Sequence, residues 1–205
     1  MEKMNIMNIF ESMFNRVVAF IALLILFPVL VLFSILLKLE NPELSPFFTQ
    51  KRIGKDQKEF FIYKLRSMKK LNKQELILLE QMNEAEGPMF KIKNDPRITP
   101  VGRIIRKTSI DELPQLINVL KGEMALVGPR PPLPNEVARY TEYELQRLKV
   151  LPGCTGLWQI SGRSDVTFKE MVELDLKYIE NKNFFFDLKI LALTFPAVLK
   201  MEGAY

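Results

Sequence analysis

Histidine is absent from this chain of 205 residues, and cysteine occurs once, as Cys154. A single cysteine cannot form an intrachain disulfide, which is typical of a protein in a reducing compartment. Without histidine, the usual proton shuttle, the Ser-His-Asp triad and nearly every kind of zinc site are excluded. Any acid–base or nucleophilic chemistry therefore falls to carboxylates, Lys, Tyr, Ser or Cys154.

Positive charge is concentrated in the middle of the chain. The net charge is +5, and residues 61–130 hold thirteen Lys or Arg against eight Asp or Glu, while both flanks are nearly balanced. A cationic middle third favours an anionic partner such as a phosphate or an anionic lipid, although a solvated surface explains it equally well. No stripe of basic residues alternates with stacking aromatic residues, so we expect no nucleic-acid partner.

A long apolar segment near the N-terminus predicts contact with a membrane. Residues 17–37 form a run of twenty-one residues without charge, and as a helix they would extend about 31 Å, the thickness of a bilayer core. The run is too long for a signal-peptide core and lacks a small-residue cleavage site, so we expect it to remain attached. Basic residues follow it, which places the rest of the chain in the cytoplasm. We therefore divide the chain into a membrane segment, 1–40, and a cytoplasmic, membrane-associated domain, 41–205.

Pro28 lies near the middle of the apolar run. In an ordinary helix an internal proline removes a backbone hydrogen bond and clashes with the preceding turn, at a cost of about 3 kcal/mol. One interpretation is a kinked helix that spans the membrane, since membrane helices tolerate proline. The other is a re-entrant helix that bends at Pro28 and returns to the side from which it entered. Composition does not separate the two.

The remaining pattern predicts an α+β fold that is mainly helical with a small β-hairpin. Residues 47–50 and 59–65 are short aromatic or apolar runs, and turn-forming residues near Gly54 and Asp56 separate them. Further helices are expected at residues 74–82 and 168–180. Another helix is expected to end with residues 145–150.

The C-terminal segment is a further expected helix. Residues 184–201 are apolar but contain Asp187, Lys189 and Lys200. This composition favours an amphipathic helix that lies in the membrane interface. A core helix that ends at Pro196 fits the same pattern.

The stretch RIIRKTSIDELPQL, residues 103–116, contains the strongest candidates for catalysis. Pro114 is tolerated only in the first turn of a helix, and the apolar spacing up to Gly122 predicts that a helix begins at about 109–111. Asp111 and Glu112 then lie where free N–H groups and the helix dipole stabilise negative charge. A purely structural interpretation remains, because Ser109 with Glu112 fits a capping box.

Three arginines strengthen the interpretation of this acidic pair as part of a functional site. Arg103 and Arg106 are three residues apart on the preceding segment, and Arg130 lies in the proline loop LVGPRPPLP, residues 126–134. Guanidinium groups suit phosphate oxygens. A carboxylate pair with arginines around it predicts a site for a metal-bound diphosphate.

These residues resemble the bacterial sugar transferases, the monotopic phosphoglycosyl transferases. The resemblance covers nearly the whole chain: the apolar run with its central proline, QKRIGKDQKEFFIYKLRSM (50–68), DPRITPVGRIIRKTSIDELPQLINVLKGEMALVGPRPPLP (95–134) and LPGCTGLWQISGRSD (151–165). It implies transfer of a sugar 1-phosphate from a UDP-sugar to undecaprenyl phosphate at the bacterial inner membrane, with release of UMP. This would be the first membrane step of exopolysaccharide, capsule or O-antigen synthesis.

The resemblance also implies roles for individual residues. Asp111 matches the nucleophile that forms an aspartyl phosphosugar, and Glu112 matches its partner, which helps to hold Mg²⁺. Basic positions near the phosphates correspond to Arg106, Arg130, Lys64 and Arg66. The membrane element of this family is re-entrant and usually breaks at a Ser-Pro pair, whereas here the pair is Phe27-Pro28.

The implied partners are a UDP-sugar, undecaprenyl phosphate and the lipid bilayer, and a homodimer is left open. The segment LWQISGRSD resembles the members that transfer hexose 1-phosphate, glucose or galactose. Trp158 and Arg163 are candidates for contacts with the nucleotide or sugar, although a tryptophan in this setting is as often a packing anchor. The alternative function is a membrane-anchored module without catalysis that binds anionic lipid or phosphate ligands.

Overall fold

The computed structural model describes residues 6–84, 87–90, 92, 94–162 and 166–199. Its α-helices are α1 (Ile6–Glu40), α2 (Lys73–Glu80), α3 (Pro100–Lys107), α4 (Leu116–Lys121), α5 (Pro134–Val137), α6 (Glu142–Leu145), α7 (Leu157–Ser161), α8 (Phe168–Asn181) and α9 (Phe184–Leu199). Short 3-10 helices are η1 (Lys55–Gln57), η2 (Ile110–Gln115) and η3 (Gln146–Lys149), and the strands are β1 (Phe47–Ile53), β2 (Glu59–Leu65), β3 (Ala125–Val127) and β4 (Gly153–Thr155). The expected fold, mainly helical with a small hairpin, is confirmed.

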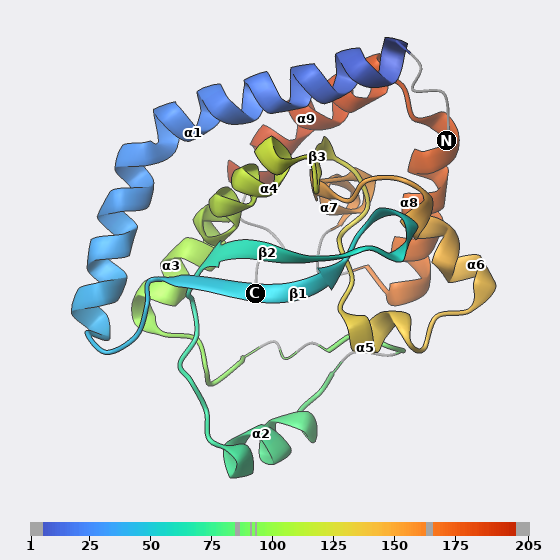
Figure 1. Cartoon of the computed structure of the whole chain (residues 1–205). Helices are drawn as coiled ribbons and strands as arrows, with labels where there is room; N and C mark the ends of the chain where they lie inside the picture. Colours follow the sequence, from blue (N-terminus) through green and yellow to red (C-terminus); the bar gives the residue numbers. More distant parts are fainter. Residues whose placement is uncertain (1–5, 85–86, 91, 93, 163–165, 200–205) are drawn as a thin grey trace.

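Helix α1 is long, apolar and largely uncovered. It continues through Pro28 as one helix, and it bends near its middle (Figure 1). Residues Ala19, Leu30 and Leu37 lie on the face that packs against the rest of the protein and are nearly inaccessible. Segment Ile9–Glu40 is long and apolar enough to cross a membrane, and only 6% of its most apolar window is buried.

Both ends of α1 contact the same folded body. Near its start, Glu11 pairs with Lys182 at 2.6 Å. At its end, Glu40 accepts a hydrogen bond of 3.0 Å from the backbone N–H of Val101. The two halves of the bent helix therefore lie along one continuous protein surface (Figure 1).

The hairpin of β1 and β2 supports the central part of the fold. The strands are antiparallel, with Lys51 opposite Phe61, and the turn includes Asp56 in the left-handed conformation at φ 54°. Helix α4 is attached to this hairpin through Asn118, whose side-chain amide donates to the Phe61 carbonyl at 2.7 Å and accepts from the Tyr63 N–H at 3.2 Å. The prediction of a hairpin with its turn near Gly54 and Asp56 is confirmed.

A second, two-stranded sheet joins segments that are distant in sequence. Strands β3 and β4 are parallel, with Ala125 opposite Gly153. A Cβ at Gly153 would lie 2.0 Å from the backbone nitrogen of Gly128, so only glycine allows this approach. The pairing places the proline loop after β3 beside the start of α7.

The C-terminal part confirms two of the expected helices and corrects one boundary. Helix α8 occupies almost the range predicted for it. Helix α9 buries Ile190 but exposes about three quarters of Phe185 and Phe195. It continues through Pro196 to Leu199, so the alternative of a helix that ends at this proline is wrong.

Candidate active site

The backbone that leads into Asp111 and Glu112 differs from its predicted geometry. Ser109 adopts the left-handed conformation at φ 56°, and its side chain makes no capping hydrogen bond. The predicted capping box with Glu112 is therefore wrong, because a capping residue needs an extended backbone to direct its oxygen at the helix N–H groups. The chain continues as the 3-10 helix η2, which contains Pro114, and only then as α4, which ends at Gly122 as expected. Asp111 and Glu112 lie in the first turn of η2.

Asp111 is a buried carboxylate, with 6% of its surface exposed. Burial raises the pKa of Asp111 to about 6, since a charged group loses hydration inside a protein. The positive charges of Lys64 and Arg106 act in the opposite direction, and the negative charge of Glu112 adds to the rise. The Asp111 carboxyl is therefore mostly ionised at neutral pH and becomes protonated as the pH falls through its pKa.

Glu112 lies beside Asp111 but has a cationic partner. Its Oε1 accepts a hydrogen bond of 2.6 Å from Nζ of Lys64 on β2. Burial acts to raise the pKa of Glu112, but the charge and hydrogen bond of Lys64, with smaller contributions from Arg130 and Arg52, hold it below its usual value. Two adjacent carboxylates with pKa values displaced in opposite directions are typical of a catalytic pair.

A cavity of about 90 Å³ opens beside Glu112. We call it the site cavity. Its lining consists of residues from the hairpin, η2, the proline loop, β4 and α7: Arg52, Ile62, Lys64, Glu112, Gln115, Arg130, Pro131, Gly153, Cys154, Trp158 and Gln159. The three cations in this set outnumber the single carboxylate, so the cavity favours an anionic ligand.

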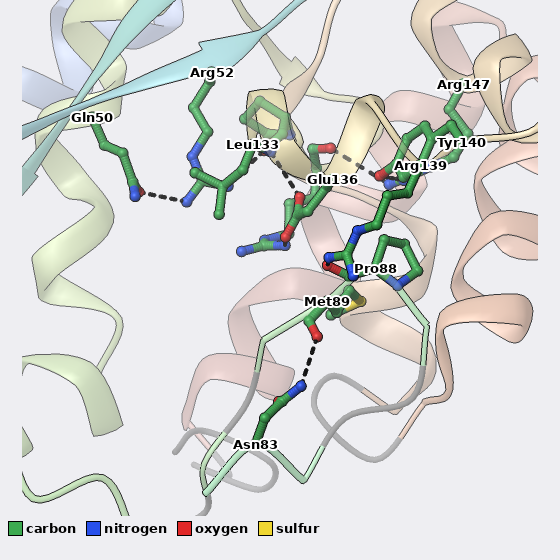
Figure 2. A network of polar contacts seen from close by, with 12 residues as sticks. Gln50, Arg52, Asn83, Pro88, Met89, Leu133, Glu136, Arg139, Tyr140 and Arg147 are labelled. Atoms are coloured by element: carbon green, nitrogen blue, oxygen red, sulfur yellow. Dashed lines mark hydrogen bonds and ion pairs between the residues drawn. The ribbon is translucent and has the colours of Figure 1, made fainter. Parts of the chain in front are cut away.

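Arg130 is held in the site cavity by its own loop and by buried polar groups. Its guanidinium lies 3.8 Å from the carboxylate of Glu136, which also accepts a hydrogen bond of 2.7 Å from the N–H of Leu133 (Figure 2). The Arg130 carbonyl accepts a hydrogen bond of 3.5 Å from the buried Arg147. Arg147 in turn pairs with Asp175 at 2.6 Å.

Arg52 was not singled out in the sequence, and the structure places it in the lining of the site cavity. It donates to the Pro131 carbonyl at 3.0 Å and to the side chain of Gln50 at 2.9 Å (Figure 2). Burial, followed by the charge of Arg130, lowers the pKa of Arg52 to about 9, so it remains cationic at neutral pH. The available signal was an arginine near the end of a short expected strand, just before the turn at Gly54.

The remaining predicted site residues do not all gather here. Arg106 acts electrostatically on Asp111, whereas Arg103 is exposed on α3. Arg66 follows β2 and lies beside the C-terminal end of α1, where its side chain donates to the Leu37 carbonyl at 3.4 Å. Trp158 lines the site cavity, and Arg163 lies outside the described residues.

Cys154 also lines the site cavity. Burial, with a smaller contribution from Glu112, raises the pKa of its thiol to about 12. A protonated thiol is a poor nucleophile. Burial therefore disfavours the thiolate form of Cys154.

Comparison with known proteins places these features in a family. The family described as "Bacterial sugar transferase" matches residues 6–201. The chain is 49% identical over 161 residues to "Galactosyl transferase CpsE" of Streptococcus agalactiae, an alignment that covers 77% of the chain and 35% of the relative. It is 48% identical over 163 residues to "Undecaprenyl-phosphate galactose phosphotransferase" of Salmonella typhimurium, with 77% and 34% covered.

A shorter relative matches over most of its length. "Exopolysaccharide production protein ExoY" of Rhizobium meliloti is 39% identical over 196 residues, which cover 94% of the chain and 86% of that protein. The chain thus spans about a third of the length of the two relatives above and most of the length of this one.

Proposed function

Because the chain belongs to the bacterial sugar transferase family, we propose that it transfers a sugar 1-phosphate from a UDP-sugar to undecaprenyl phosphate and releases UMP. This phosphoglycosyl transfer would be the first membrane step in the synthesis of an exopolysaccharide, a capsule or an O antigen. The names of two relatives, an undecaprenyl-phosphate galactose phosphotransferase and an exopolysaccharide production protein, support this assignment.

The observation that carries the proposal is the pair of unequal carboxylates beside a cationic cavity. Asp111 is buried, while Glu112 is held ionised by Lys64 at 2.6 Å. The cations Arg52, Lys64 and Arg130 line the adjacent cavity. Phosphoryl transfer depends mainly on positioning and on neutralising charge, and this arrangement supplies both.

In the first half of the reaction, the Asp111 carboxylate attacks the phosphorus that carries the sugar. A new O–P bond forms on Asp111, the P–O bond to the nucleotide breaks, and UMP leaves with the electron pair. Arg130 and Lys64 compensate the negative charge that develops on the phosphoryl oxygens. The product is an acyl phosphosugar on Asp111.

In the second half, an oxygen of undecaprenyl phosphate attacks the same phosphorus. The bond to Asp111 breaks, and the carboxylate is regenerated as the lipid-linked diphosphosugar forms. A phosphate acceptor is already largely ionised at neutral pH, so the reaction needs no general base. A chain without histidine is therefore compatible with this chemistry.

The acidic pair fits a magnesium ion that the substrate helps to hold. No group of three or more potential ligands from His, Cys, Asp or Glu occurs among the described residues. Mg²⁺ is commonly bound through one or two carboxylates together with substrate phosphates, and Glu112, whose side chain is 43% exposed, is the candidate ligand. When bound, the ion would neutralise diphosphate charge.

We further propose that α1 is re-entrant and that the site faces the cytoplasm at the inner membrane. The contacts of Glu11 with Lys182 and of Glu40 with Val101 support this topology, because they connect both ends of α1 to one body. The exposed aromatic residues of α9 support its place in the membrane interface. The sugar is proposed to be a hexose, galactose or glucose, in keeping with the galactose named for two relatives.

Mass spectrometry tests the proposed reaction. The purified protein is incubated with Mg²⁺ and a panel of UDP-sugars, first without undecaprenyl phosphate and then with it. We expect a hexose-phosphate adduct on the peptide that contains Asp111, one equivalent of UMP, and loss of the adduct when the acceptor is added. Turnover without an adduct, with kinetics that require both substrates together, would contradict the aspartyl intermediate.

A further inference from the structure

The lining of the site cavity includes several residues with a buried polar atom that lacks a hydrogen-bond partner. Six described residues have such a side-chain atom, and three of the six line this one cavity: Arg52 with Nε, Trp158 with Nε1 and Gln159 with Oε1. Buried polar groups in folded proteins are nearly always hydrogen-bonded. Three exceptions among the residues that line one cavity, which also include Glu112, point to a ligand that satisfies them.

The chemistry of these atoms restricts the ligand. Arg52 and Trp158 offer N–H donors, while Gln159 offers a carbonyl acceptor. A phosphate oxygen accepts hydrogen bonds but gives none, so phosphate alone does not satisfy Gln159. A hydroxyl group both donates and accepts, and it satisfies the Gln159 amide in either orientation. The part of the lining formed by Trp158 and Gln159 is therefore suited to a hydroxylated group.

The cationic part of the lining is suited to a negative charge. Arg52 donates to two neutral oxygens, the Pro131 carbonyl at 3.0 Å and the Gln50 side chain at 2.9 Å, and Glu136 and Glu112 act on it only through their charge. Arg130 and Lys64 line the same space. A buried cation without a carboxylate in direct contact favours an anionic ligand.

We propose that the site cavity holds the half of the donor that is transferred, the hexose 1-phosphate, with its phosphoryl group at Arg52 and its ring hydroxyls at Trp158 and Gln159. This inference rests on the proposed function and assigns sugar recognition to α7. The transferred half must remain beside Asp111 during both half reactions, and Glu112, its neighbour in the chain, lines this cavity. The UMP half leaves after the first step and lies outside it.

Trp158 provides a direct readout, because it is the single tryptophan of the chain. The full chain with Asp111→Asn, which blocks turnover, is placed in lipid nanodiscs and titrated with UDP-galactose, UDP-glucose, the hexose 1-phosphates and UMP. Binding is measured in parallel by equilibrium dialysis. We expect a shift in tryptophan emission with the preferred UDP-hexose and its hexose 1-phosphate, and none with bound UMP.

The outcomes separate the two proposals. An equal shift with UMP, or a bound UDP-hexose that leaves the emission unchanged, overturns the sugar subsite. An emission shift in a wild-type protein that releases no UMP overturns the transferase function and leaves the subsite standing. Absence of binding by any UDP-sugar overturns both.

Substitutions test the roles of the two α7 side chains. Trp158→Phe keeps an aromatic ring without the N–H, and Gln159→Leu removes the acceptor. We expect each substitution to lower kcat/KM for the preferred UDP-hexose about tenfold to a hundredfold. The ratio of this kcat/KM to that for UDP-N-acetylhexosamines should fall, and the inhibition constant of UMP should stay unchanged. Gln74→Leu, at an exposed position of α2, is the matched control. Equal losses for UMP and UDP-hexose would place these residues at the nucleotide instead.

Discussion

Asp111 and Glu112 are adjacent in the chain but differ in their surroundings. Lys64 reaches Glu112 and compensates its charge, while burial raises the pKa of Asp111. The sequence predicted that both residues belong to one site, because Pro114 restricts where the helix can start. It did not predict which carboxylate is paired, because that depends on β2, which is distant in sequence.

Asp111→Asn tests the nucleophile. The amide preserves the size of the side chain but is a far poorer nucleophile, so we expect UMP release to fall about a thousandfold or more, equivalent to roughly 4 kcal/mol in the barrier. Asp56→Asn is a suitable control, because asparagine tolerates the left-handed conformation found at Asp56. A loss of only a few-fold at Asp111 would show that another group attacks phosphorus.

Lys64→Met tests the electrostatic balance of the pair. In the proposed mechanism activity needs the Asp111 carboxylate, so activity should be lost as the pH falls through the pKa of this group, which is about 6. The charge of Lys64 lowers this pKa, so its removal should raise the pKa and move the acid limb of the kcat/KM profile to higher pH. We expect kcat/KM to fall about tenfold near pH 6.5 and to recover partly at pH 8.5. Lys51→Met, which breaks an exposed pair with Glu59, should leave the profile unchanged. A uniform loss at all pH values would indicate that Lys64 contacts only the phosphates.

At the scale of elements, local patterns predicted the secondary structure well where backbone chemistry decided it. The hairpin, α8 and the stop at Gly122 followed from turn residues and apolar spacing. The capping box at Ser109 failed because a tight turn after α3 forces this residue into the left-handed region. The parallel pairing of β3 with β4 left no signal in either short strand, because its basis is a long-range contact at Gly153.

Pro28→Ala tests the bend of α1. Alanine restores the missing hydrogen bond and removes a penalty of about 3 kcal/mol for a straight helix. In a Cys154→Ala background, cysteines at positions 9 and 43 should both be labelled from the cytoplasmic side only. We expect Pro28→Ala to make position 9 partly accessible from the periplasm, whereas Pro196→Ala in α9 should not. Periplasmic labelling of position 9 with Pro28 in place would establish a spanning helix.

At the scale of the whole molecule, one buried ion pair connects the proline loop to the C-terminal helices. Arg147 and Asp175 are each almost fully buried, and Arg147 also donates to the Tyr140 hydroxyl at 2.8 Å (Figure 2). Burial raises the pKa of Asp175 to about 6 even though Arg147 opposes the rise. The sequence did not single out this pair, since neither residue belongs to a recognisable motif.

Arg147→Met tests this connection. It leaves Asp175 buried without a counter-charge, which should lower the free energy of unfolding by about 3–5 kcal/mol. A raised pKa means that Asp175 binds its proton more tightly in the folded state than in the unfolded state. The loss in unfolding free energy should therefore grow as the pH rises through this pKa and be smaller at pH 5 than at pH 8. Thermal unfolding at both pH values measures it. The double variant Arg147→Met, Asp175→Leu should recover most of the stability, and an equal loss in the double variant would refute the charge explanation.

The contact between Glu11 and Lys182 joins residues 171 positions apart, and it has a consequence for biogenesis. A ribosome that adds about 5–20 residues per second delivers the partner of Glu11 roughly ten to thirty seconds after Glu11 itself. During that interval α1 is already present while Lys182 and the helix α9 that follows it have not been synthesised. Because the folded protein buries only 6% of the most apolar window of α1, the nascent segment depends on the bilayer, or on a chaperone, for most of its cover.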